Sequence, residues 1–182
     1  MRILASMSKK ALKKYLEGLK KKELELQIMD LYGRFAEVKT YYDFVFNPRE
    51  DKLLQQAKQK ISNEYFPLKR KRPKARRSVA QKFIKHFRTL GMDPYLIADL
   101  MLFNLETAQR YSERQKVNDA FYKSMLTSFR EVMQHTILHG QLPDFRDRIL
   151  SIHAFTQEQG WLYAEEFDRI LENAILTGGE SN

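Results

Sequence analysis

The chain has 182 residues, no cysteine and a formal net charge of +9, with 43% hydrophobic and 30% charged residues. This hydrophobic content can build a core, so wholesale disorder is excluded, and the lack of cysteine excludes disulfides, thiolate metal sites and cysteine nucleophiles. The scarcity of glycine (7) and proline (5) disfavours a sheet-rich fold with many tight turns. The most apolar window, residues 95–105, is too short to span a bilayer, so we expect no membrane contact.

Apolar residues recur at helical spacing from the start of the chain. Ser8 is a candidate N-cap for a first helix, and Gly18 marks its exit. Two more apolar stripes follow at 24–35 and 38–45, and each repeats every three to four residues. These spacings predict three helices before the first strong break in the pattern.

The sequence Asn47-Pro48-Arg49-Glu50 predicts the start of a fourth helix. Asn47 can accept hydrogen bonds from the first-turn amides, and Pro48 stands where its missing N–H costs nothing. Glu50 would complete a capping box. We expect this helix to stop before Pro67, because a residue that precedes proline disfavours helical geometry.

The segment Lys69–Arg77 (KRKRPKARR) is the most informative feature of the chain, because seven of its nine residues are basic and none is acidic. Such charge density repels itself and has to meet either water or an anion. One interpretation is a phosphate-binding surface that extends onto the following helix. The other is a solvated linker, or one that pairs with the acidic half of the chain. The candidate polyanion-binding residues are Lys69, Arg70, Lys71, Arg72, Lys74, Arg76, Arg77, Lys85 and Arg88.

Aromatic residues directly precede this basic run. Tyr65 and Phe66 are either part of the core or available to stack on unpaired bases, as aromatic side chains beside basic residues can do. Trp161 follows Gly160 at a predicted corner between helices, where we expect it to anchor the last helix.

The remainder of the chain is also helical in pattern. Apolar stripes predict helices within 80–90, 94–108, 116–139, 143–159 and around 167–171. No strand alternation of useful length appears. The fold class we predict is therefore all-α, a compact multi-helix bundle of about eight helices.

The expected organisation has three parts, which are an N-terminal helical part at 7–67, a basic linker at 68–77 and a C-terminal helical bundle at 78–177. We expect the two helical parts to form one compact unit. Residues 47–92 hold 14 basic and 3 acidic side chains, whereas residues 93–182 hold 8 and 14. The basic half can either attract the acidic half within one fold or face an anionic partner.

Two stretches carry a resemblance to a known family. They are SKKALKKYLEGLKKKELELQIMDLYGRFAEVKTYY at residues 8–42 and the Gly160-Trp161 turn with the acidic helix after it. Both are similar to an uncharacterised bacterial family of small all-helical proteins, a domain of unknown function. The resemblance covers most of the chain and implies a bacterial, cytoplasmic, all-helical protein. It implies no activity and assigns no residue a role.

One predicted helix carries a candidate metal site. Glu131, His135 and His139 are spaced four apart and share one helical face, which suits metal ligands. The alternative is a polar helix edge in which Glu131 and His135 form an ordinary pair. We assign no metal and no cofactor, and keep these three residues as candidates.

No catalytic motif is present, because the chain lacks a glycine-rich phosphate loop, a GxSxG elbow and a dinucleotide fingerprint. We therefore assign no catalytic residue and lean towards a non-enzymatic protein. The sequence predicts a helical binding protein that contacts nucleic acid or another polyanion through its basic segment. The alternative is a protein–protein interaction module that uses a helical groove, and a metal-dependent enzyme is the third possibility. The sequence specifies neither the partner nor the oligomeric state.

Overall fold

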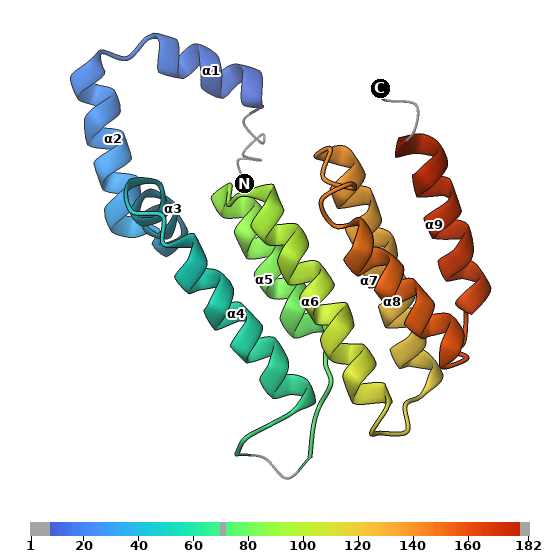
Figure 1. Ribbon diagram of the computed structural model, residues 1–182. Coiled ribbons are helices and arrows are strands. Elements are labelled where there is room, and N and C mark those ends of the chain that lie inside the picture. The colour runs from blue at the N-terminus through green and yellow to red at the C-terminus, as the bar shows by residue number, and fades with distance from the viewer. Residues whose placement is uncertain (1–7, 70–71, 179–182) are drawn as a thin grey trace, which may run out of the picture. The chain divides into compact units, whose positions relative to one another are not determined.

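The computed structural model describes residues 8–69 and 72–178, and this part of the chain contains nine helices and no strand (Figure 1). The all-α fold class is therefore confirmed, with one helix more than the expected number of about eight. The chain divides into two compact units between Pro48 and Arg49. Each unit is described by itself below.

The first unit holds α1 (Lys9–Glu17), α2 (Lys21–Arg34) and α3 (Ala36–Phe46). The side-chain oxygen of Ser8 accepts a hydrogen bond from the backbone N–H of Ala11 at 3.2 Å, so Ser8 caps α1 as predicted. α2 packs against α3, and the Tyr32 hydroxyl donates to an Asp43 carboxylate oxygen across this contact at 2.7 Å. None of the residues in these three helices is buried.

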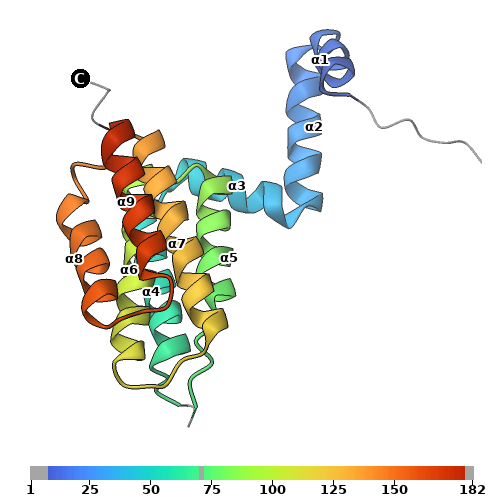
Figure 2. The ribbon, with the colours of Figure 1, turned by 90° about the vertical axis from the view of Figure 1, so that its right-hand side faces the viewer.

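The second unit holds α4 (Glu50–Tyr65), α5 (Arg77–Leu90), α6 (Pro94–Ser112), α7 (Asp119–Leu138), α8 (Arg146–Glu158) and α9 (Ala164–Gly178). These helices run alternately up and down, as Figures 1 and 2 show. The connections α4–α5, α6–α7 and α8–α9 consequently lie at the same end of the unit. We call this end, formed by residues 66–69, 72–76, 113–118 and 159–163, the basic end.

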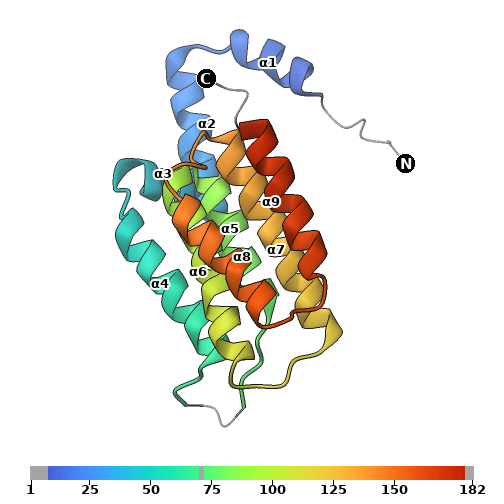
Figure 3. The ribbon, with the colours of Figure 1, turned by 45° about the vertical axis from the view of Figure 1, so that its right-hand side comes forward.

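Helix α6 is the centre of the second unit, because it contacts α4, α5, α7 and α8 (Figure 3). Its side chains are apolar on more than one face, and Leu100, Leu102 and Leu105 are fully buried. Burial of each leucine contributes roughly 1.5–3 kcal/mol to folding. α6 contains the apolar window at 95–105. No helix in the described part of the chain combines the length and the apolar character that crossing a membrane requires.

Helix α4 belongs to the second unit. It packs against α5 and α6 and buries Leu54, Ala57 and Ile61. These residues recur at helical spacing and form one continuous apolar stripe. The division of the chain therefore comes after Pro48, earlier than the expected division after residue 67.

The predicted capping of α4 is wrong. α4 begins at Glu50 after Arg49, which makes no side-chain cap. The Asn47 N–H instead donates to carbonyls at the end of α3, so this residue finishes one helix and does not open the next. The Glu50 carboxylate accepts a hydrogen bond from the backbone N–H of Asp93, at 3.0 Å. The contact of Glu50 with Asp93 has thus replaced the predicted capping box with Asn47.

Candidate polyanion-binding site

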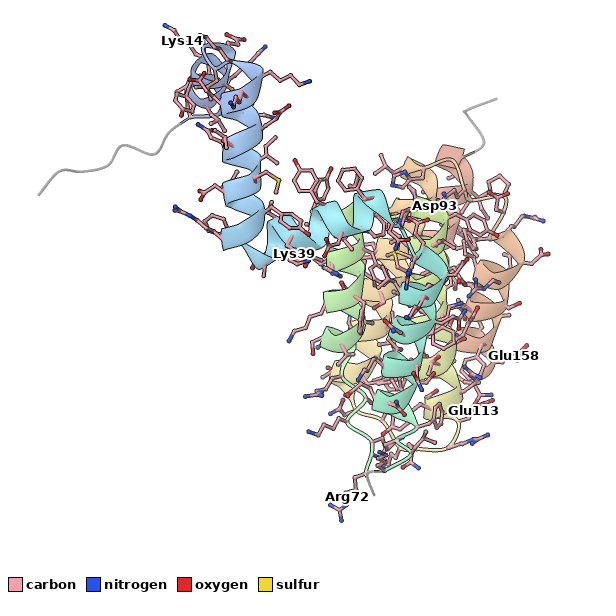
Figure 4. The ribbon with its side chains drawn as sticks, turned by 90° about the vertical axis from the view of Figure 1, so that its left-hand side faces the viewer. Lys14, Lys39, Arg72, Asp93, Glu113 and Glu158 are labelled. Carbon is pink, nitrogen blue, oxygen red and sulfur yellow. The ribbon has the colours of Figure 1, made fainter. Side chains whose placement is uncertain are left out.

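The basic segment, residues 69–77, connects α4 to α5 at the basic end. Lys69, Arg72 and Lys74 are exposed, and Figure 4 shows Arg72 pointing away from the bundle at the tip of the connection. Arg70 and Lys71, which were also predicted to bind a polyanion, lie outside the described residues.

Glu64, near the end of α4, fixes the second half of the basic segment. Its backbone carbonyl accepts hydrogen bonds from the N–H groups of Lys74 (3.0 Å) and Ala75 (2.9 Å). Ala75 adopts a left-handed backbone with φ of 47°, uncommon for a residue other than glycine. The Glu64 carboxylate accepts from Arg76 Nε at 2.9 Å and Nη2 at 3.1 Å, and this hydrogen bonding raises the pKa of Arg76. Glu64 therefore holds the segment through both its backbone and its side chain.

Arg77 ties the start of α5 to α7. Its Nε donates to Ser128 Oγ at 2.8 Å, and its Nη2 lies 2.7 Å from a Glu131 carboxylate oxygen without pointing an N–H at it. The other Glu131 oxygen accepts from Gln81 at 2.8 Å. Arg76 and Arg77 were predicted to contact phosphates. The structure places both in ion pairs with carboxylates of the chain itself.

A cavity of about 780 Å³ opens beside the basic segment, between the starts of α5 and α7. Four cationic side chains line it, and no carboxylate of the described residues does. The lining also includes hydroxyl and amide groups over an apolar floor, in which Phe121 is 9% and Met125 1% exposed. The cationic residues are Lys74, Arg76, Arg77 and Lys116, and the neutral polar ones are Ser78, Asn118, Ser124 and Tyr111. Both helices present their positive N-terminal ends here, which adds to the attraction for an anion.

Lys74 and Lys116 supply the cavity's unbalanced charge, since neither forms an ion pair within the described part of the chain. Two acidic residues lie three positions from Lys116 in sequence, Glu113 and Asp119, and neither lines the cavity. Asp119 is already engaged. It accepts from Lys123 Nζ and from the Tyr163 hydroxyl, and these hydrogen bonds lower the pKa of the Asp119 carboxyl. The local field at the cavity is therefore positive.

Comparison with known proteins adds a family to this geometry. Residues 7–174 match a family described as a family of unknown function, DUF6155. The chain belongs to this family. No curated protein and no solved structure matches it. The DUF6155 match includes nearly all of both units, and it confirms the resemblance to an uncharacterised all-helical family.

In this DUF6155 chain, Lys85 and Arg88 lie on α5 but do not line the cavity at the basic end. Arg88 is in the last turn of a 14-residue helix, which is about 21 Å long. It lines a second cavity of about 610 Å³, where its Nη2 lies 3.4 Å from His135 Nδ1. The structure thus separates Arg88 from the basic segment by most of the length of α5.

The three candidate metal ligands all line this second cavity, and His139 packs against His135 with ring centroids 4.5 Å apart, but the other two are engaged elsewhere. Glu131 is held by Arg77 and Gln81. His135 Nε2–H donates to the Pro94 carbonyl at 2.9 Å, which leaves Nδ1 as the acceptor facing Arg88. Burial lowers the pKa of His135 despite the Pro94 hydrogen bond, and nearby positive charge lowers it further. No three His, Asp or Glu side chains among the described residues gather closely enough to hold a metal ion.

The aromatic residues before the basic segment have separate roles. Tyr65 is 2% exposed and its hydroxyl donates to Asn104 Oδ1 at 3.4 Å, so it belongs to the core. Phe66 is half-buried, lies against Tyr111 and is covered by the Arg114 guanidinium at 5.8 Å from the ring centroid.

Sequence reasoning missed the residues that complete the cavity. Tyr111, Lys116 and Asn118 come from the α6–α7 region, about forty residues beyond the basic segment in sequence. A local signal existed for Asn118 alone, because an asparagine before an apolar-periodic run predicts an N-cap, and its side chain does accept from the Phe121 N–H.

Proposed function

We propose that this protein is a non-enzymatic helical binding protein whose basic end binds nucleic acid. The observation that carries the proposal is the cavity at the basic end, which has four cationic residues and no carboxylate in its described lining. A cleft lined by one sign of charge concentrates ligands of the opposite sign. Phosphate is the anion that repeats along a nucleic acid, so several contacts can form at once.

Different roles follow for the basic residues. Lys69, Arg72, Lys74 and Lys116 contact phosphates, because they are exposed and project from the basic end. Arg70 and Lys71 lie outside the described residues and stay candidates from the sequence alone. Arg76 and Arg77 act as positioning residues, since their own carboxylate partners fix the backbone from which Lys74 projects. Lys85, which is exposed on α5, extends the basic surface along that helix, whereas Arg88 lies at the far end of α5 and is left out of the proposed site.

Contacts of this kind position a nucleic acid but do not read its sequence. The basic segment is held at its second half by Glu64, so binding need not order that half from a random state. Less conformational entropy is then lost on association.

Fluorescence anisotropy with short labelled DNA and RNA across a salt series tests the proposal. The variant carries Lys69→Glu, Arg72→Glu and Lys74→Glu, which removes three phosphate contacts. We expect the wild-type protein to bind tightly at low salt. In the variant, the slope of log binding constant against log salt concentration should be shallower by about 2 units.

A matched variant with Lys9→Glu, Lys10→Glu and Lys14→Glu on α1 changes the net charge equally and should keep the wild-type slope. Absence of binding at about 50 mM salt would refute the proposal. An equal decrease of the salt slope in both variants would refute it as well.

A second candidate function is protein–protein interaction through the first unit, and we propose a second copy of this chain as the partner. The observation that favours it is the exposure of Leu26 (63%), Met29 (64%) and Phe46 (82%) in a unit whose three helices bury no residue. Large exposed apolar surfaces mark interaction sites. A bacterial, cytoplasmic setting stays a prediction.

A further inference from the structure

We infer that the cavity at the basic end receives one unpaired nucleotide of a single-stranded nucleic acid. The base lies against Tyr111 and Phe121, and the flanking phosphates lie on Lys74 and Lys116. This inference rests on the proposed function and specifies its substrate class. The ligand is then a single-stranded nucleic acid, and one of its bases lies inside the cavity.

The floor of the cavity is suited to a flat apolar group. Tyr111 is half-buried, and it continues into a chain of packed rings, with centroids 5.6 Å from Tyr65 and 6.2 Å from Phe121. Phe121 in turn packs edge-on against Trp161 at 5.8 Å. These contacts hold the cavity-facing rings rigidly, so a base that stacks on them costs little reorganisation.

The rim of the cavity is suited to the polar edges of a base and to the phosphates on either side of it. Ser78, Asn118 and Ser124 offer hydroxyl and amide groups to the polar edges of a base. Lys74 comes from the α4–α5 connection and Lys116 from the α6–α7 connection, so cations reach the rim from two sides. A strand whose base enters the cavity carries a phosphate on each side of that base.

The size and shape of the cavity favour a single strand over a duplex. A volume of about 780 Å³ is in the range of ligand cavities and admits a nucleotide. In a duplex, each base is stacked on both faces and paired at its edge, so it must be flipped out before it can reach a concave wall. In a single strand, the base is already free to turn inward.

Oligonucleotides that differ only in one base test the inference. The probes are a labelled five-residue deoxythymidine strand and the same strand with an abasic central residue, which keeps every phosphate. We expect the abasic strand to bind roughly 5- to 150-fold more weakly, the range that corresponds to the loss of one stacked base. The salt slopes of the two strands should agree, because their charges are equal.

A plug variant locates the base. Ala120 is exposed at the second position of α7 and lines the cavity, so Ala120→Trp fills the cavity without removing a core contact. We expect this variant to bind both strands alike, with the affinity of wild type for the abasic strand. Ala154→Trp, at an exposed position on α8, is the matched control and should keep the wild-type difference. Circular dichroism confirms that both variants are folded.

The outcomes separate this inference from the proposed function. Equal affinity of the wild-type protein for the two strands would overturn the inference and leave polyanion binding intact. A duplex that binds as tightly as the single strand would overturn it as well. Failure of every probe to bind at low salt would overturn the proposed function itself.

Discussion

Glu64 is the residue that makes an ordered surface from a self-repelling segment. The seven cations of the basic segment repel one another, so the segment does not take up a compact conformation without a partner of opposite charge. Glu64 is buried (7% exposed), and its carboxylate forms a two-pronged pair with Arg76. A bidentate pair fixes direction as well as distance. The second half of the basic run is therefore held by one residue outside it, through the Glu64 carbonyl at Lys74 and Ala75 and through the Glu64 carboxylate at Arg76.

Glu64→Gln tests this dependence. The amide keeps the size of the side chain but has no charge and can accept through only one oxygen, so the ion pair and one of the two hydrogen bonds with Arg76 are lost. We expect trypsin to cleave within residues 69–77 several-fold faster than in the wild-type protein, measured as loss of intact chain by mass spectrometry. Binding to oligonucleotides should weaken in parallel.

Glu113→Gln is the matched control for this change. Glu113 is exposed at the same end of the bundle, as Figure 4 shows, and its replacement removes one negative charge without touching the basic segment. Equal cleavage rates in the two variants would show that Glu64 does not hold the segment.

His135 predicts a dependence of stability on pH. Burial lowers its pKa below the ordinary value of 6.5, so the unfolded chain binds a proton that the folded chain resists. The contribution of neutral His135 to the free energy of unfolding is therefore complete above about pH 6.5. It is lost as the pH falls through the pKa of His135 in the folded state. The groups around it are Arg88 of α5, the Pro94 carbonyl, and Glu131 and His139 of α7.

Urea unfolding at pH values from 5.5 to 7.5 measures this dependence. We expect the free energy of unfolding to fall towards low pH, by up to about 1.4 kcal/mol per pH unit from this one group. In His135→Gln, which cannot take up the proton, that part of the slope should disappear. His86→Gln, at an exposed position on α5, should keep it. A His135→Gln profile that parallels the wild type would contradict the prediction.

At the scale of elements, α2 and α3 combine exposed apolar residues with charges that are already balanced. Within these helices, Lys21 pairs with Glu25, Arg34 with Asp30 and Lys39 with Asp43. Two copies of this surface can therefore approach without strong charge repulsion. A unit of this size that buries none of its helical residues gains stability from a partner, and the chain has no cysteine for a disulfide.

The double change Leu26→Gln and Met29→Gln tests self-association. If this surface joins two copies, the wild-type chain should sediment as a dimer at micromolar concentration, and the variant should be a monomer under the same conditions. The matched control is Leu138→Gln with Leu162→Gln, which replaces two exposed leucines of the second unit. A wild-type protein that is monomeric at every concentration would exclude this second function.

Sequence signals for helix ends were correct where the capping contact is local. Ser8 caps α1 as predicted, Asp93 caps α6 in the same local way, and Gly91 ends α5 with a positive φ of 74°. Each of these signals acts within a few residues, so no distant group competes with it. The predicted start of α4 failed because the two partners that Asn47 and Glu50 found, the end of α3 and the start of α6, are not visible in a local pattern.

On the scale of the whole molecule, the fold class followed from periodicity, whereas the site followed only in part. The basic segment is visible in composition alone. The cavity beside it is not, because Lys116 and Tyr111 reach it through the up-and-down order of the helices. The same order placed Arg88, which a helical wheel groups with the basic run, at the far end of α5. Charge is thus readable from sequence, but its grouping into a site is a property of the fold.

The central position of α6 also bears on how the chain is made. α4 and α5 leave the ribosome before α6, which is a packing partner of both, so their apolar stripes stay only partly covered until residue 112 has emerged. During this interval the most basic stretch of the chain, residues 47–92, precedes the acidic residues that follow it. Vectorial synthesis therefore exposes the cations of the nascent chain beside ribosomal RNA before the bundle that orders them exists. Translation speed through α6 then sets how long that exposure lasts.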